Sequence, residues 1–168
     1  MADQHPVVTE ATTADVPAVS TFFWDAWRQA GPDSPGFAGA TEDVIAEITT
    51  PELIRSRLGG PDRRMYIAKQ DDRIVGFAST RAETTTVVEL SGVIVLEELI
   101  GTGVGGMLVE AAIDASAKHG FQAMTVSTEV DNDRARSFYE QKGFEPIGRA
   151  VELVGETTVE VVNLRRKL

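Results

Sequence analysis

Four glycines stand close together in the middle of the chain, directly after a run of apolar residues. The stretch from Val93 to Leu108 reads VIVLEELIGTGVGGML. A buried strand that passes through a glycine turn into a helix presents the first-turn N–H groups of that helix, which have no internal acceptor. The aligned peptide dipoles add partial positive charge there. We therefore expect an anion cradle, most plausibly for a pyrophosphate. It is formed by Gly101, Thr102, Gly103, Val104, Gly105 and Gly106.

Two other interpretations of this loop stay open. Glycines also permit a tight turn and close packing of a helix on a strand. In addition, Gly101, Gly103 and Gly106 match the spacing of the dinucleotide-binding fingerprint, and Glu129 lies near the distance expected of a ribose-binding acid. That fingerprint normally opens a doubly wound fold, whereas only about 60 residues follow here and they end in a hairpin. A Walker A loop is excluded, because no Gly-Lys-Ser/Thr follows.

A second distinctive stretch, from Asn132 to Phe144, reads NDRARSFYEQKGF. Asn132 is suited to begin a helix as its N-cap, and Gly143 is suited to end it. Phe138 is expected in the core. Its neighbour Tyr139 must point in a different direction, so its hydroxyl lies either in water or in a site.

Together the two stretches resemble the GNAT superfamily, the acetyl-CoA-dependent N-acyltransferases. The family loop reads Arg/Gln-x-x-Gly-x-Gly/Ala, and the later motif reads Asn-x-x-Ala-x-x-Phe-Tyr followed by Gly-Phe. The resemblance is good from Met65 to Leu168 and holds only in outline from Pro6 to Leu58. The matching residues are Gly103, Gly105, Asn132, Ala135, Phe138, Tyr139, Gly143 and Phe144.

One position departs from the family pattern. Ile100 stands where the family has the Arg or Gln that helps to hold a CoA phosphate. Its presence implies weaker cofactor binding, or compensation by Arg134, Arg136 or Lys142. The cradle itself does not depend on that side chain, because backbone N–H groups form it.

The resemblance implies an enzyme that transfers acetyl from acetyl-CoA directly to a primary amine, with a small-molecule amine favoured as acceptor. Direct attack is simpler than a covalent acyl-enzyme, because the chain has no cysteine. The strand before the loop is expected to carry a bulge and to diverge from the next parallel strand. The pantetheine arm would enter that gap, and a backbone N–H there would polarise the thioester carbonyl. The residues implied to contact the arm are Val93, Ile94, Val95, Asn132, Ala135 and Phe138.

Two proton transfers must accompany the reaction. Glu89 matches a position where some family members place the general base, acting directly or through water. It could equally be an exposed strand carboxylate, and Glu83 and Glu129 are further candidates. Tyr139 would protonate the leaving thiolate, because a tyrosine of pKa about 10 is protonated near neutral pH.

The acceptor is expected over the helix that holds Trp24 and Trp27 and over the loop from Gly31 to Gly39. An indole facing the cleft could lie over a cationic or aromatic amine. Asp25 could pair with the amine's charge. The spacing of the aromatic residues here is equally compatible with a place in the core.

These residues need a framework of alternating elements to position them. Helices are predicted from Thr12 to about Gln29, from Thr41 to Leu58 with a break at Pro51, and over 103–119 and 133–142. Strands are predicted over 6–10, 65–69, 74–80, 86–95, 123–129, 145–153 and 159–164, with an Asp71-Asp72 hairpin. The order indicates a single α/β (α+β) domain over residues 1–168. Its mixed, mostly antiparallel sheet of about seven strands has one parallel β-α-β crossover, with helices on both faces.

Composition limits the other functions. The formal net charge is −10, so the chain lacks the basic footprint of a nucleic-acid binder and would attract amines instead. No apolar run is long enough for a membrane span, and no spacing suggests a metal site. A cytoplasmic enzyme is expected, and a hydrophobic edge strand could support a homodimer. A non-catalytic CoA- or acyl-CoA-binding regulatory module and a nicotinamide-dinucleotide enzyme are the alternatives.

Overall fold

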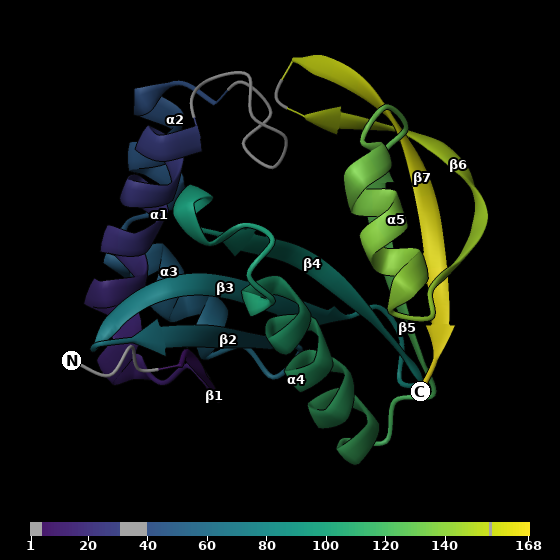
Figure 1. Cartoon of the computed structure of the whole chain (residues 1–168), viewed down its shortest axis with the longest axis horizontal. Coiled ribbons are helices and arrows are strands. Elements are labelled where there is room, and N and C mark those ends of the chain that lie inside the picture. The colour runs from purple at the N-terminus through teal and green to yellow at the C-terminus, as the bar shows by residue number, and fades with distance from the viewer. Residues whose placement is uncertain (1–4, 31–39, 155) are drawn as a thin grey trace.

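The computed structural model describes residues 5–30, 40–154 and 156–168, so the predicted loop from Gly31 to Gly39 and the turn at Gly155 lie outside it. Its centre is a seven-stranded sheet of order β1-β2-β3-β4-β5-β7-β6 (Figure 1). Of the strand pairs, β4 and β5 are parallel and the others are antiparallel. The strands are β1 (Val7–Glu10), β2 (Arg63–Gln70), β3 (Arg73–Ala82), β4 (Val87–Val95), β5 (Ala123–Glu129), β6 (Glu145–Val154) and β7 (Thr157–Lys167).

The helices begin where the sequence provides caps. The hydroxyl of Thr50 accepts the N–H of Leu53 at 3.3 Å, and α3 starts at Pro51, which confirms the predicted break. The helix predicted from Thr12 starts as a 3₁₀ turn, in which the Asp15 carboxylate accepts the Thr12 N–H at 2.8 Å. The helices are α1 (Val16–Ala30), α2 (Glu42–Ile48), α3 (Pro51–Leu58), α4 (Val104–Lys118) and α5 (Asp133–Gln141), with 3₁₀ turns at Thr13–Asp15 and Glu97–Leu99.

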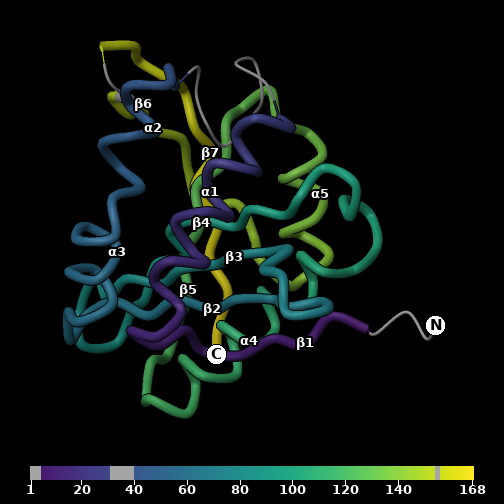
Figure 2. Tube along the Cα trace, turned by 90° about the vertical axis from the view of Figure 1, so that its left-hand side faces the viewer, coloured from purple at the N-terminus to yellow at the C-terminus, as the bar shows by residue number. Residues whose placement is uncertain are grey.

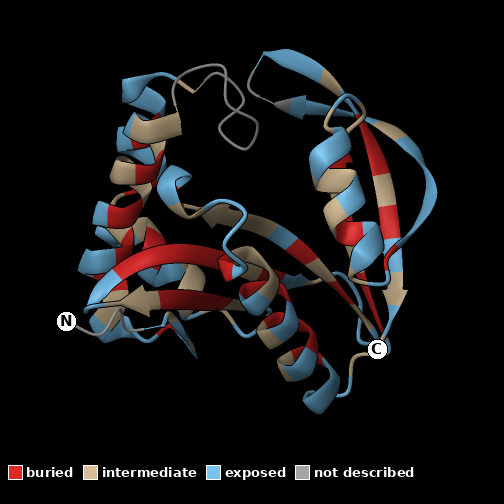
Figure 3. Ribbon diagram, viewed as in Figure 1, coloured by how far each residue is buried: buried red, intermediate tan, exposed pale blue. Residues whose placement is uncertain are grey.

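Neighbouring residues of β3 show which helix covers which face of the sheet. A Cβ on Gly76 would lie 2.8 Å from Leu108 Cδ1, so the glycine allows α4 to approach the strand closely. The next side chain, Phe77, points to the other face and packs against Phe22 and Phe23 of α1, at ring distances of 6.5 and 4.8 Å. Figure 2 shows α3 and α5 on opposite sides of the strands, and Figure 3 shows the buried residues concentrated in the central strands and on the inner faces of the helices. The predicted mixed sheet with helices on both faces is confirmed.

The sheet is interrupted between β4 and β5. These strands pair only through Val87–Ala123, Val88–Met124 and Glu89–Thr125. Beyond that point β4 continues beside β3, and β5 continues beside β7. On β4, Ser91 is an extra residue, because Thr80 pairs with Leu90 while Ser79 pairs with Gly92. The bulge and the diverging strands that the resemblance implied are both present.

None of the described helices is both long and apolar enough to cross a lipid bilayer.

Candidate active site

A cleft opens where β4 and β5 diverge. Residues 90–94 of β4 and 126–129 of β5 line it. Helix α5 adds Asn132, Ala135 and Tyr139, whose spacing places them on one face of the helix. The structure thus brings together five predicted site residues at one place: Val93, Ile94, Asn132, Ala135 and Tyr139.

Tyr139 is buried beneath the end of this cleft, with 8% of its surface exposed. Its ring meets those of Phe138 and Phe144 edge-on, at 5.1 and 5.7 Å between centroids. Burial disfavours the phenolate and raises the pKa of Tyr139 to about 12. The hydroxyl is therefore protonated at any pH at which an amine acceptor would be studied. Phe138 points differently, toward Gly105 of α4, as the neighbouring positions required.

Asn132 has two functions available to it. Its side-chain oxygen accepts the N–H of Ala135 at 3.1 Å, which confirms that it is the N-cap of α5. The same side chain lines the cleft. The amide N–H₂ group, which the cap does not use, can therefore donate to a ligand.

The glycine loop forms an open cradle at the start of α4. Gly101 and Gly103 have φ values of 83° and 100°, a conformation that other residues adopt only with strain. The Thr102 N–H and hydroxyl both donate to the Leu99 carbonyl, at 3.2 and 2.6 Å. Met107 N–H donates to Gly103 O at 3.0 Å, so the preceding N–H groups, at 104–106, have no acceptor within the helix.

The space in front of this loop suits an anion. A Cβ built on Gly101 or Gly103 would meet nothing within 4 Å. At Gly105 it would lie at an ordinary 3.7 Å from Val95 and Phe138, which ties the loop to the end of β4 and to α5. The loop thus adjoins the end of β4 and α5, which flank the cleft, and the N–H groups without a helical acceptor fit a diphosphate.

Lys142 is the cation that lies beside the cradle. A Cβ on Gly106 would be 3.0 Å from its ammonium nitrogen, which pairs with Glu110 at 2.7 Å. Arg136, another candidate to compensate for Ile100, pairs with Asp133 on its own helix instead. Ile100 itself is exposed, at the position where the family pattern has Arg or Gln.

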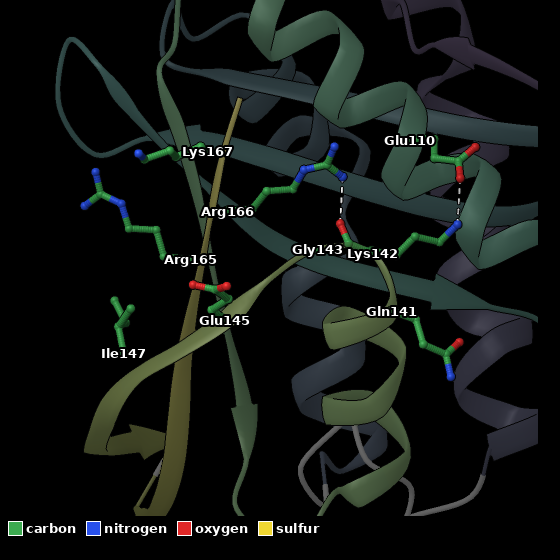
Figure 4. Close-up of a pocket in the computed structure, with 9 residues that line it drawn as sticks. All are labelled: Glu110, Gln141, Lys142, Gly143, Glu145, Ile147, Arg165, Arg166 and Lys167. Carbon is green, nitrogen blue, oxygen red and sulfur yellow. Dashed lines mark hydrogen bonds and ion pairs between the residues drawn. The ribbon is translucent and has the colours of Figure 1, made fainter.

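A second, shallow hollow begins at Lys142 and continues along the ends of β6 and β7. Figure 4 shows Lys142 reaching Glu110 of α4 and Arg166 pointing to the Lys142 carbonyl, to which it donates at 2.6 Å. Arg165 and Lys167 project from the neighbouring positions of β7. The sequence analysis did not single out this basic strand end. Three consecutive cations in an acidic chain were the signal available.

Glu89 lies outside the described lining of the cleft. It pairs at 2.6 Å with Arg81, which is its direct partner across the β3–β4 ladder. Glu129, at the end of β5, does line the cleft and is half-buried. No described cation lies within 4 Å of its carboxylate. As a general base, Glu129 is therefore the better placed of the two.

The predicted acceptor residues on α1 make contacts elsewhere. The indole rings of Trp24 and Trp27 pack edge to face at 6.0 Å, and Trp27 Nε1 donates to Ala40 O at 2.8 Å. Asp25 faces Arg73 at 3.9 Å. Phe23, one position earlier on the helix, lines the cleft in their place. Contact between an acceptor and Trp24, Asp25 or Trp27 stays a prediction, and their described contacts do not favour it.

The model of the GNAT acetyltransferase family matches residues 17–144, and the chain belongs to that family. It is 26% identical over 144 residues to the uncharacterized N-acetyltransferase YhfO of Bacillus subtilis, covering 82% of this chain and 89% of YhfO.

Solved structures share the fold. The paiA N-acetyltransferase of Thermoplasma acidophilum, in complex with coenzyme A, superposes with a TM-score of 0.72 at 17% identity, over 98% of this chain and 100% of that one. The yncA protein of Salmonella typhimurium, with its cofactor acetyl-CoA, gives 0.72 at 18% identity, over 98% and 95%. At these identities the likeness establishes the architecture.

Proposed function

We propose that this enzyme transfers the acetyl group of acetyl-CoA directly to a primary amine bound in the cleft between β4 and β5. The observation that carries the proposal is the three-residue ladder between those strands, beyond which β4 has an unpaired edge. The strand continues through the 3₁₀ turn at Glu97–Leu99 into the glycine loop, and Tyr139 lines the same cleft. One extended molecule with a phosphate end and a thioester end fits this combination.

The backbone is proposed to hold the cofactor. The N–H groups at 104–106, at the head of α4, would take the pyrophosphate, with Lys142 released from Glu110 to meet a phosphate. The unpaired edge of Val93–Val95 would pair with the pantetheine amides, and Asn132 would donate to the same arm. Ala135 and Phe138 would provide apolar contact.

The chemistry is divided among three groups of the chain. A backbone N–H of β4 would polarise the thioester carbonyl, an effect that is often worth about 3 kcal/mol. Glu129 would take a proton from the ammonium form of the acceptor, directly or through water. Tyr139 would donate its hydroxyl hydrogen to the leaving sulfur. Acetyl-CoA supplies the activated acetyl group.

Two measurements test the proposal. Titration with CoA should show saturable binding, and acetyl-CoA with a panel of amines should release free thiol. Binding without turnover on any amine would favour the non-catalytic module, for which Ile100 is the supporting feature. Thermal stabilisation by NADH, and none by CoA, would instead favour a nicotinamide enzyme.

We also propose a cytoplasmic location and homodimer formation through β6. The chain has no cysteine, in keeping with a reducing compartment. Strand β6 is an edge of the sheet and exposes Ile147, Val151 and Leu153. Light scattering of the wild type against Val151→Lys tests the dimer: a monomeric mass for both would exclude it.

A further inference from the structure

The corner between α3 and β2 places two arginines in the wall of the cleft. Arg57 lies in the last turn of α3 and Arg63 is the first residue of β2, and both line the cleft. The turn through Gly59 and Gly60 brings them together, and within it the Arg63 N–H donates to the Gly60 carbonyl at 3.4 Å. Arg57 and Arg63 therefore form part of the cleft wall contributed by α3 and β2.

Neither guanidinium has a carboxylate partner among the described residues. No carboxylate oxygen there lies within 4 Å of Arg57 or Arg63, whereas Arg64 and Arg81 nearby pair with Glu10 and Glu89 at 2.8 and 2.6 Å. Partial burial, and then the charge of Arg63, lower the pKa of Arg57. Two half-buried like charges without an anion are unexpected in a chain with 26 acidic and 16 basic residues.

The surroundings of the two arginines strengthen their field. Phe23, Met65 and Phe77 line the same cleft and give it an apolar floor. An apolar wall lowers the local dielectric, so a charge–charge contact there is stronger than at an open surface. Glu129 and Glu152, from β5 and β6, line the cleft as well. The cleft therefore offers cations and carboxylates to the same ligand.

We propose that Arg57 and Arg63 form an oxyanion subsite, so that the preferred acceptor is an amine that also carries a carboxylate or phosphate group. Arginine forks bind both groups through paired hydrogen bonds. An amino acid is the simplest such acceptor, with its ammonium group directed to Glu129 and its carboxylate to the two arginines. The proposal rests on the acetyltransferase function, and it names the acceptor class.

Anion binding can be measured without turnover. The protein is first saturated with CoA, so that the glycine loop is occupied, and unfolding temperatures are then compared in acetate, phosphate and chloride at constant ionic strength. We expect acetate or phosphate at ten times its dissociation constant to raise the unfolding temperature of the wild type by about 3 °C. The shift should be lost in Arg57→Gln and Arg63→Gln.

Arg55→Gln is the matched control, because Arg55 lies in the same turn of α3 but is exposed and does not line the cleft. It changes the net charge equally and should keep the full shift. Without an added anion, Arg57→Gln should be at least as stable as the wild type, since it removes a like-charge contact. A purely structural arginine would instead leave a less stable protein when replaced.

Pairs of amines that differ only in the presence of an acidic group show whether the arginines bind a carboxylate or a phosphate. Amino acids are compared with their amides, and phosphoethanolamine with ethanolamine, by release of free thiol. We expect acid-bearing amines to have at least a tenfold higher kcat/KM, with KM raised about tenfold by Arg57→Gln while KM for acetyl-CoA is unchanged. A preference confined to one pair identifies carboxylate or phosphate as the group bound.

Two results would overturn the subsite. One is an anion shift that is equal in Arg57→Gln and Arg55→Gln. The other is turnover of amides and ethanolamine as efficient as that of their acidic counterparts. Failure of the acetyltransferase function looks different: no amine releases thiol, while the difference between the two variants in the anion titration is still measurable.

Discussion

The two proposed halves of the site differ in the kind of polar group that they present: backbone N–H groups in one and side chains in the other. On the proposed cofactor side, the donors are backbone N–H groups at the start of α4 and the unpaired edge of β4. On the proposed acceptor side, the charged groups are the side chains of Arg57, Arg63, Glu129 and Glu152, on an apolar floor. The backbone donors depend on a turn geometry, whereas the side-chain groups depend on individual residues.

This difference explains which departures from a family pattern the chain can accept. Ile100 replaces a side chain on the cofactor side, and the cradle of N–H groups is still intact. On the acceptor side, a change of one arginine or carboxylate changes which amine fits. We therefore expect the cofactor side to be sensitive to backbone and charge at the glycine loop, and the acceptor side to be sensitive to single side chains.

The largest effect is expected from Gly105→Asp. The new side chain would start 3.7 Å from Val95 and Phe138, one residue into the first turn of α4, and its charge would repel a phosphate bound at the head of that helix. Affinity for CoA should therefore fall more than about 100-fold by calorimetry. The helix itself should not be weakened, because an acidic residue in a first turn is favourable. Gly148→Asp, where a Cβ meets nothing within 4 Å, is the charge-matched control. Unchanged affinity in Gly105→Asp would mean that the phosphates bind elsewhere.

Tyr139→Phe should lower kcat about 100-fold with little change in KM for acetyl-CoA, because it removes the proposed donor to the sulfur and preserves the ring. The control is Tyr66→Phe, which removes the hydroxyl of a buried tyrosine that does not line the cleft. Steady-state kinetics give kcat and KM for acetyl-CoA in both variants and in the wild type. Equal activity of the two would exclude Tyr139 as the essential donor.

The raised pKa of Tyr139 also predicts a dependence of stability on alkaline pH. The phenol has a folded pKa of about 12 against an ordinary value of 10.0, so its contribution is complete below pH 10. As the pH rises from 10 to 12, the unfolded chain loses the proton first, and about 2 kcal/mol of stability is lost. Urea denaturation between pH 9 and 12 should therefore show a steeper decline for the wild type than for Tyr139→Phe. Parallel curves would contradict the burial of the hydroxyl.

Glu129→Gln should lower kcat/KM about tenfold near neutral pH, with a smaller deficit at high pH where the amine is already neutral. Glu89→Gln should change activity less than about twofold, because Glu89 pairs with Arg81 outside the cleft. The pH profiles of kcat/KM for the two variants show whether Glu129 or Glu89 is the general base. A large loss in Glu89→Gln alone would restore Glu89 as the base.

Much of the fold was predictable because its signals are local. Strand β5 was predicted with the bounds that it has in the structure, and the break before Pro51 and the cap at Asn132 follow from single residues. The glycine loop and the face of α5 that holds Tyr139 could be predicted for the same reason. Each depends on spacing within one element.

The acceptor side was harder because its geometry is decided between distant segments. The end of the β4–β5 ladder and the bulge at Ser91 determine that Glu129 reaches the cleft and Glu89 does not. On α1, neighbouring aromatics offered several possible faces, and packing against Phe77 selected Phe23. Arg57 and Arg63 become neighbours only through the turn between α3 and β2.

The three-rung junction between β4 and β5 has a mechanical consequence. It divides the sheet into one block of β1 to β4 and a second block of β5, β7 and β6. The two blocks are joined to each other by only three paired positions of the ladder between β4 and β5. A ligand that fills the cleft between β4 and β5 would contact both blocks and connect them where the two strands no longer pair. We therefore expect occupancy to stiffen the whole protein, with amide exchange slowing on both sides of the junction, in β3 of one block and in β7 of the other.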